Sequence, residues 1–208
     1  MSRGHRRITS FAGNQNTKYA FCSSAGLQGL TKCRNVIATV AQIGAGGMMG
    51  SENSADLTQD GSFNLVSLVD QNGFDNSAVV TQSGDSNEVA LIDQDGSANS
   101  ATLNFTGNLN GTAAFTGASD AANVGLTQGQ VIQNNASGSS LNTISYDVFG
   151  DSNLFAFEQN GSGNTIDGDV GSMASDAFSN EAAVAQNGDG NTASFTQMGT
   201  GNNLGITQ

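Results

Sequence analysis

The strongest constraint on this chain is a short pattern, Gln-x-Gly-x-x-Asn, that recurs along it. Each Asn opens a segment of alternating residues that closes on another Gln, as in Asn76 to Gln82. Alternate side chains of a strand share one face, so the two amides of such a segment point the same way. The Gly suits a chain reversal that needs a positive φ. The pattern predicts a strand and a turn for each copy, and the copies begin at Gln59, Gln71, Gln82, Gln94, Gln159, Gln186 and Gln197.

The spacing of the copies predicts how the strands are arranged. From Asn53 the rows start at alternating intervals of 11 and 12 residues, so the period is 23. A fixed period of this size is typical of a solenoid or an array. Each row between Gly-containing turns is too short for a helix and suits a strand. We therefore predict an all-β fold, a cross-β solenoid with two facing strands per turn and turns stacked about 4.8 Å apart.

The amides at the two ends of each row are predicted to point into the interior. An isolated buried amide costs a few kcal/mol, but amides stacked on identical amides donate to one neighbour and accept from the next. The predicted ladder residues are Asn53, Gln59, Asn64, Gln71, Asn76, Gln82, Asn87, Gln94, Asn99, Asn153, Gln159, Asn164, Asn180, Gln186, Asn191, Gln197, Asn202 and Gln208. The predicted turn glycines are Gly61, Gly73, Gly84, Gly96, Gly161, Gly188 and Gly199.

The apolar interior is predicted at the second and fourth positions after each Asn. This rule gives the pairs Ala55/Leu57, Val66/Leu68, Ala78/Val80, Val89/Leu91, Ala101/Leu103, Ile144/Tyr146, Phe155/Phe157, Ala193/Phe195 and Leu204/Ile206. The repeat is degenerate around 116–141, where Val124, Leu126 and Gln128 keep the phase, and again around 170–179.

The distribution of charge predicts two regions. All six basic residues lie in the first 34 positions, and all 18 acidic residues lie from Glu52 onward. We expect a basic leader at 1–50 and a repeat domain at 51–208. The leader has the order of an export signal, basic then apolar (36–43) then small, or it is a disordered basic tail. No run approaches the roughly 20 apolar residues of a membrane span, and a wholly acidic domain argues against nucleic acid as a partner.

Reactive side chains are scarce in the repeat domain. His5, Cys22 and Cys33 all lie in the leader, where a disulfide between the two cysteines is one option. The repeat domain has no thiol, imidazole or amine side chain. Its acidic pairs at 93–95 and 167–169 lack the further ligands of a calcium loop. We therefore expect no enzyme, and assign no catalytic residue, cofactor or metal site.

The extended row Gln-x-Gly-x-x-Asn-x-Ala-x-Val-x-Gln resembles the curlin repeat of curli subunits. It occurs in 71–82 and, with Phe for Val, in 186–197. Curli subunits are secreted bacterial proteins that polymerise into extracellular amyloid fibres in biofilms. The resemblance implies that Asn76, Gln82, Asn87 and Gln94 match the family's inward ladder residues. It also implies a secreted subunit on the cell surface, with other copies of itself, a related nucleator or main subunit, and an outer-membrane export machinery as partners.

The ends of the predicted solenoid favour self-assembly. Open solenoids expose unpaired strand edges, which monomeric ones cover with caps. The rows start close to the leader and run to Gln208, so we expect head-to-tail contacts that do not close and hence a fibre. The alternative is a monomeric secreted β-solenoid, either an adhesin or an ice- or divalent-binding protein. Divalent binding would use the exposed carboxylates. The ice-binding and adhesin alternatives are based on threonines at the fifth position of several rows, namely Thr58, Thr81, Thr127, Thr196 and Thr207.

Overall fold

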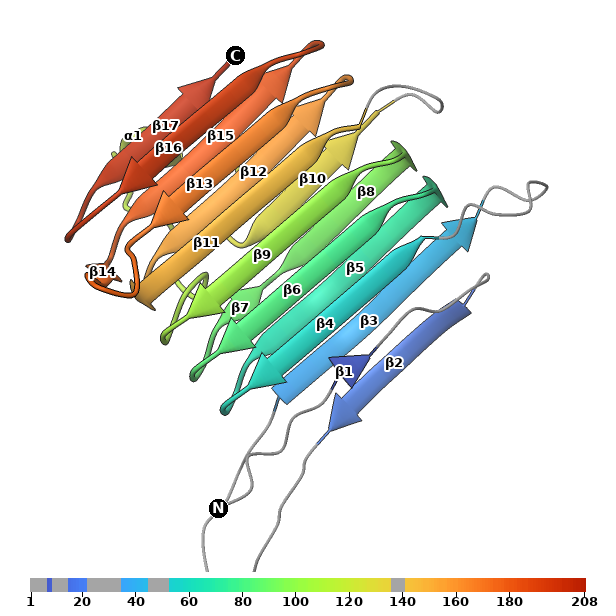
Figure 1. Ribbon diagram of the computed structural model, residues 1–208, viewed down its shortest axis with the longest axis horizontal. Helices are drawn as coiled ribbons and strands as arrows, with labels where there is room; N and C mark the ends of the chain where they lie inside the picture. The colour runs from blue at the N-terminus through green and yellow to red at the C-terminus, as the bar shows by residue number, and fades with distance from the viewer. Residues whose placement is uncertain (1–6, 9–14, 22–34, 45–52, 136–140) are drawn as a thin grey trace, which may run out of the picture.

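The computed structural model describes residues 7–8, 15–21, 35–44, 53–135 and 141–208. Two facing sheets of stacked strands make up almost all of this part of the chain (Figure 1). Sheet A contains β4 (Ser54–Asp60), β6 (Ser77–Ser83), β9 (Ser100–Thr106), β11 (Thr143–Asp151), β13 (Thr165–Val170) and β16 (Thr192–Gln197). Sheet B contains β3 (Asn35–Gly44), β5 (Leu65–Phe74), β7 (Glu88–Val89), β8 (Leu91–Ser97), β10 (Gln130–Asn134), β12 (Leu154–Asn160), β15 (Glu181–Asn187) and β17 (Asn203–Thr207).

The chain passes from one sheet to the other and back in each turn. Consecutive rungs of a sheet pair in parallel and in register with the repeat, so that Gln71 lies beside Gln94 and Ser77 beside Ser100. The result is a β-solenoid of about six turns, which confirms the predicted fold class. In the described parts of the chain, no helix has the length and hydrophobicity needed to span a membrane.

The first three rows of sheet B carry one residue more than the rows of sheet A. The Gln follows the Asn by seven positions in 35–42, 64–71 and 87–94, and by six in the later rows of sheet B, such as 153–159, and in the Gln-ended rows of sheet A. The extra residue acts as a bulge and reverses the alternation halfway along the row. The predicted interior positions of Leu68 and Leu91 are therefore wrong. Both are only half-buried, and Val69 and Ile92 are buried in their place.

One row of sheet B is built from two segments that are separated in sequence. Gly111 and the Asn110 carbonyl lie beside Glu88, and the Gly129 carbonyl accepts the N–H of Ala90. Residues 112–128 leave the solenoid between these glycines and contain the helix α1 (Asp120–Asn123). The prediction that Val124, Leu126 and Gln128 keep the phase is wrong, because β10 completes the row instead.

The second degenerate stretch is a bulge in a turn. Strand β13 ends at Val170, and β14 (Ala177–Phe178) pairs with Gly150 and Asp151 of β11. Residues 171–176 therefore loop out, and Ala177 takes the turn position that a glycine holds in the rung below.

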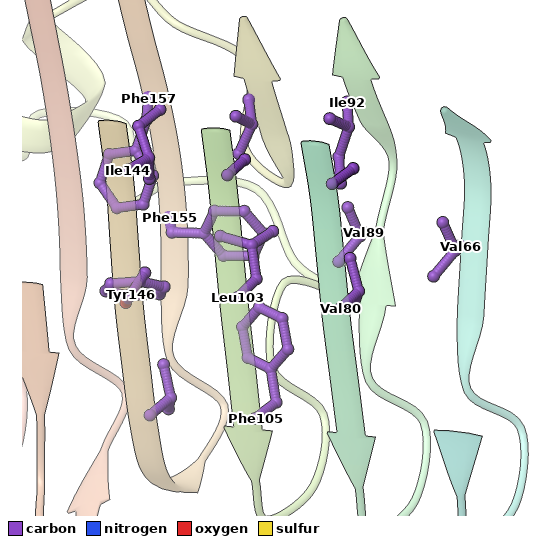
Figure 2. Packing of buried hydrophobic residues seen from close by; sticks show 14 of the residues in the cluster. Val66, Val80, Val89, Ile92, Leu103, Phe105, Ile144, Tyr146, Phe155 and Phe157 are labelled. Atoms are coloured by element: carbon purple, nitrogen blue, oxygen red, sulfur yellow. The ribbon is translucent and has the colours of Figure 1, made fainter. Parts of the chain in front are cut away.

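Aromatic rings fill the interior where the split row lacks a counterpart of Val89. The ring of Phe155 lies against Gly111 and packs on Phe105 and Tyr146, with ring centroids 5.3 and 5.5 Å apart (Figure 2). Phe157 meets Tyr146 edge-on at 4.9 Å. Offset and edge-to-face aromatic contacts fill volume closely, so the stack stays packed across the interruption.

The parallel stack includes residues before position 51. Strand β3 pairs with β5 so that Gln42 lies beside Gln71, which places the apolar run of the predicted export signal in a rung of sheet B. Two further strands pair antiparallel with the outer edges of this end, β1 (Arg7–Ile8) with β4 and β2 (Gln15–Phe21) with β3. His5, Cys22 and Cys33 lie outside the described residues.

Candidate assembly site, the amide ladders and the ends of the stack

The glutamines of sheet B form one continuous chain of side-chain hydrogen bonds. The Nε2 atom of each Gln donates to Oε1 of the Gln in the next rung, over distances of 2.7–3.0 Å. The second N–H of Nε2 donates to a backbone carbonyl of sheet A, such as Thr143 O for Gln159 at 3.1 Å. All members except the last are buried. They are Gln42, Gln71, Gln94, Gln133, Gln159, Gln186 and Gln208.

The asparagines of sheet B form a second continuous ladder that involves the backbone. The Oδ1 atom of each Asn accepts the backbone N–H of the Asn in the next rung at 2.7–3.1 Å. The Nδ2 atom reaches a turn carbonyl of that rung, as from Asn87 to Gly107 O at 2.8 Å. An amide is the side chain that can donate and accept in these two directions at once. The members are Asn35, Asn64, Asn87, Asn110, Asn153, Asn180 and Asn202.

Sheet A has only fragments of these ladders. Gln59 donates to Gln82 at 2.8 Å, but the same position in the following rungs is apolar. Gln197 follows these apolar residues, and its Oε1 has no hydrogen-bond partner among the described residues. The apolar positions are Phe105, Val148 and Val170.

The asparagines of sheet A stack in two groups. Asn53, Asn76 and Asn99 are linked in one, and Asn142, Asn164 and Asn191 in the other. Between the groups, the buried Oδ1 of Asn99 has no partner in the part of the chain that the structure describes. The amide network is therefore continuous along sheet B and interrupted along sheet A.

Several ladder members were absent from the sequence-based prediction. Asn35 and Gln42 have the same seven-position spacing as Asn64 and Gln71, a signal that could have found them. Gln133 gave no local signal, because the Asn that opens its row lies on the far side of residues 112–128.

The turn glycines allow the rungs to stack at strand spacing. Gly73 has φ +113, and a Cβ added to it would lie 1.8 Å from Gly96 O in the next rung. Gly84 faces Gly107 O in the same way at 2.0 Å. At the C-terminal end, a Cβ on Gly188 would have only one neighbouring atom within 4 Å, at 3.8 Å, and a Cβ on Gly199 would have none. These two glycines have the same turn geometry with no described rung stacked on them.

Carboxylates on the outer faces lie beside like charges because the rungs are in register. Burial, and then repulsion from Asp70 in the adjacent rung, raises the pKa of Asp93. Burial, and then repulsion from Asp167 and Asp147, raises the pKa of Asp169. Within the described residues, no group of three or more His, Cys, Asp or Glu side chains converges as a metal site would.

The threonines behind the ice-binding alternative do not share one face. Thr58 and Thr81 are register neighbours in sheet A, whereas Thr127 lies in the inserted segment and Thr207 in sheet B. After Thr81, the sheet A column continues with Asn104, Asp147, Asp169 and Thr196. The regular Thr array that ice binding requires is therefore absent from this column.

Comparison with known proteins agrees with the geometry of the rows. The family profile of the curlin associated repeat matches residues 50–84, 68–91 and 179–208. These matches cover two stretches of the stack in which the Gln-x-Gly-x-x-Asn turns are intact. No curated protein and no solved structure gave a significant match. The repeat and the solenoid fold are of a structural and not an enzymatic type, and the chain carries curlin associated repeats near both ends of the stack.

Proposed function

We propose that this protein is a structural subunit that assembles head-to-tail into extracellular, curli-type amyloid fibres. The observation that carries the proposal is the complementary polarity of the two ladder ends. The last rung has the Nε2 donor of Gln208 and the Oδ1 acceptor of Asn202. The first rung has the Oε1 acceptor of Gln42 and the backbone N–H of Asn35. A second copy placed on the first would repeat the bonds found inside the stack.

The strand edges support the same contact. Among the described strands, β16 and β17 each pair with a neighbour on one side only. An unpaired edge strand is a template for another strand, and a head-to-tail contact between identical stacks gives an open filament. The curlin associated repeats support a secreted location and a role in biofilm matrix and surface adhesion, with a related subunit and an outer-membrane export machinery as partners.

Strands β1 and β2 have a specific place in this proposal. Strand β2 pairs antiparallel with β3, the edge to which a second copy would add in parallel, and β1 pairs with β4 beside it. We propose that the export leader lies within the predicted region 1–50 and ends before Asn35, and that loss or displacement of 1–34 frees this edge. Residues 35–44 then serve as the first rung of sheet B.

The direct test compares the full chain with a chain that begins at Asn35. We expect the shortened chain to form thioflavin-positive filaments with a reflection near 4.8 Å. The lag time before its thioflavin signal rises should be shorter than that of the full chain, because the edge of β3 is free. Electron microscopy and size-exclusion chromatography provide the measurement. Persistent monomers of both chains would favour a monomeric solenoid adhesin instead.

Acidification is expected to speed assembly. The raised pKa values of Asp93 and Asp169 mean that the charged carboxylates destabilise the folded stack at neutral pH. As pH falls through these raised values towards the ordinary pKa near 3.8, protonation removes that repulsion and stability rises. Thioflavin lag times of the shortened chain should therefore be shorter at pH 4 than at pH 7. The D93N/D169N variant should show a smaller difference, and equal lag times for the parent chain would contradict the proposal.

A further inference from the structure

The inserted segment 112–128 lies on the outer face of sheet B, over its C-terminal rungs. Helix α1 packs against β15 and β17, at the end of the stack marked by the C-terminus (Figure 1). The Oγ atom of Ser119 caps the helix by accepting the Ala122 N–H at 3.1 Å. Ala121 is fully buried against Ala156 and Ala183 of sheet B. The segment thus starts from the split row that β10 completes and extends along the outer face of sheet B to its last rungs.

The surface beneath α1 is shaped for close approach. One register column of sheet B reads Leu91, Gln130, Ala156, Ala183 and Gly205, so its residues become small towards the C-terminal end. A Cβ added to Gly205 would lie 2.1 Å from the carbonyl oxygen of Asp120. Strand β17 therefore accommodates the helix backbone directly.

A carboxylate joins the inserted segment to the last two strands of sheet B. The Oε1 atom of Glu181 accepts the backbone N–H of Thr116 at 2.9 Å and its hydroxyl at 2.5 Å. The Oε2 atom accepts Nδ2 of Asn203 at 2.7 Å, and Oδ1 of Asn203 accepts the Ala121 N–H at 2.8 Å. Burial alone would raise the pKa of Glu181, but hydrogen bonds from Ser119, Thr116 and Asn203 lower it. This network needs two acceptor oxygens at Glu181.

We propose that segment 112–128, latched by Glu181, holds β17 in the register on which a second copy of this chain adds. The inference rests on the proposed function and assigns a template role to one end of the stack. Strand β17 pairs on one side only, and its side chains are half-buried or exposed, which favours local opening. A strand already held in place spares the incoming copy the entropic cost of ordering both partners.

Amide hydrogen exchange in the soluble full chain tests the latch without assembly. In E181Q the Gln offers one acceptor oxygen, so either Thr116 or Asn203 loses its partner. We expect the protected amides of 203–207 to exchange roughly tenfold to a hundredfold faster, with 154–160 unchanged. The matched control is E88Q. Glu88 directly follows the Asn of its row, as Glu181 does, and its replacement by Gln removes the same charge. Unchanged exchange in E181Q would overturn the latch.

Dependence on pH separates a latch from general loosening. A lowered pKa means that the stability from ionised Glu181 is present above its ordinary value of 4.5 and is lost as pH falls through the lowered value. Besides Glu181 on β15, the elements packed together here carry two charged side chains, Asp120 on α1 and Glu158 on β12. Strand β17 carries none. Protection of 203–207 should therefore fall at acid pH in the parent chain and in E88Q. In E181Q, acidification should cause no such fall in the protection of 203–207, because the carboxylate that titrates is missing.

Seeded growth of the chain that begins at Asn35 tests the template role. E181Q monomers should elongate E181Q seeds more slowly than the parent or E88Q proteins elongate theirs. A second variant, in which one Ala replaces 112–128, gives this row the seven-position spacing of 64–71 and 87–94 and should also be slow. Faster exchange with unchanged elongation would overturn the template role. If the parent chain forms no filaments, the proposed function fails, and the exchange result still decides whether the latch exists.

Discussion

Replacement of Gln208 by Glu is expected to stop fibre growth while leaving the soluble chain folded. Along the ladder of sheet B, each Gln donates from Nε2 to Oε1 of the Gln in the next rung, as Gln159 does to Gln186 at 3.0 Å. If a second copy repeats this bond, Nε2 of Gln208 donates to Oε1 of its Gln42. A carboxylate has no proton to donate at neutral pH, so acceptor oxygens would face each other, and we expect no measurable elongation of Q208E seeds.

The soluble chain should tolerate this change. Residue 208 is exposed, and a carboxylate oxygen can still accept from Nε2 of Gln186, as Oε1 does at 2.8 Å. Only the bond from Nε2 to Thr192 O, at 3.2 Å, is lost. The matched control is N187D, which adds the same charge at an exposed position outside the ladder and keeps the oxygen that accepts from Asn160.

Mixed-seed experiments give the clearest measurement. A Q208E monomer still has a normal first rung, so it should add to the free β17 edge of a parent fibre and then terminate it. Small amounts of Q208E should therefore inhibit parent growth, whereas N187D should not. Growth of Q208E at the parent rate would show that copies do not stack through this ladder.

Replacement of Gln159 by Leu is expected to cost the soluble chain about 3 kcal/mol or more, since each buried polar group left unpaired costs about 1–3 kcal/mol. Gln159 accepts from Gln133 at 2.9 Å and donates to Gln186 at 3.0 Å and to Thr143 O at 3.1 Å. Leu has a similar volume but breaks all three bonds in the middle of the continuous ladder.

The control for this prediction is Q197V in sheet A. Gln197 donates to Glu181 O at 3.0 Å, but its Oε1 has no partner among the described residues, and Val170 holds the same position in the rung before. Q197V should therefore change the free energy of unfolding by less than about 1 kcal/mol. Denaturant unfolding of the soluble chains compares the two. Equal costs would mean that the continuous ladder adds nothing beyond an isolated amide.

The sequence alone was sufficient for the rows, the turns and the stacked fold. Those features repeat locally, and each copy of Gln-x-Gly-x-x-Asn carries its own turn glycine and amides. The prediction failed where one residue changes the parity of a row. Leu68 and Val69 are adjacent and similarly apolar, and only the bulge in sheet B decides which of them is buried.

Contacts between distant segments were decided by the tertiary structure. Asn110 and Asn153 are ladder neighbours across the inserted segment, although they are 43 positions apart. Thr116 and Glu181 are 65 apart, and no local pattern marks either as a partner of the other. The sequence by itself determined a repeated strand that must be stacked, because buried amides need identical neighbours. Only the tertiary structure determined which strands stack, where the ladders break and how the last strand is held, because those outcomes depend on which segments meet in space.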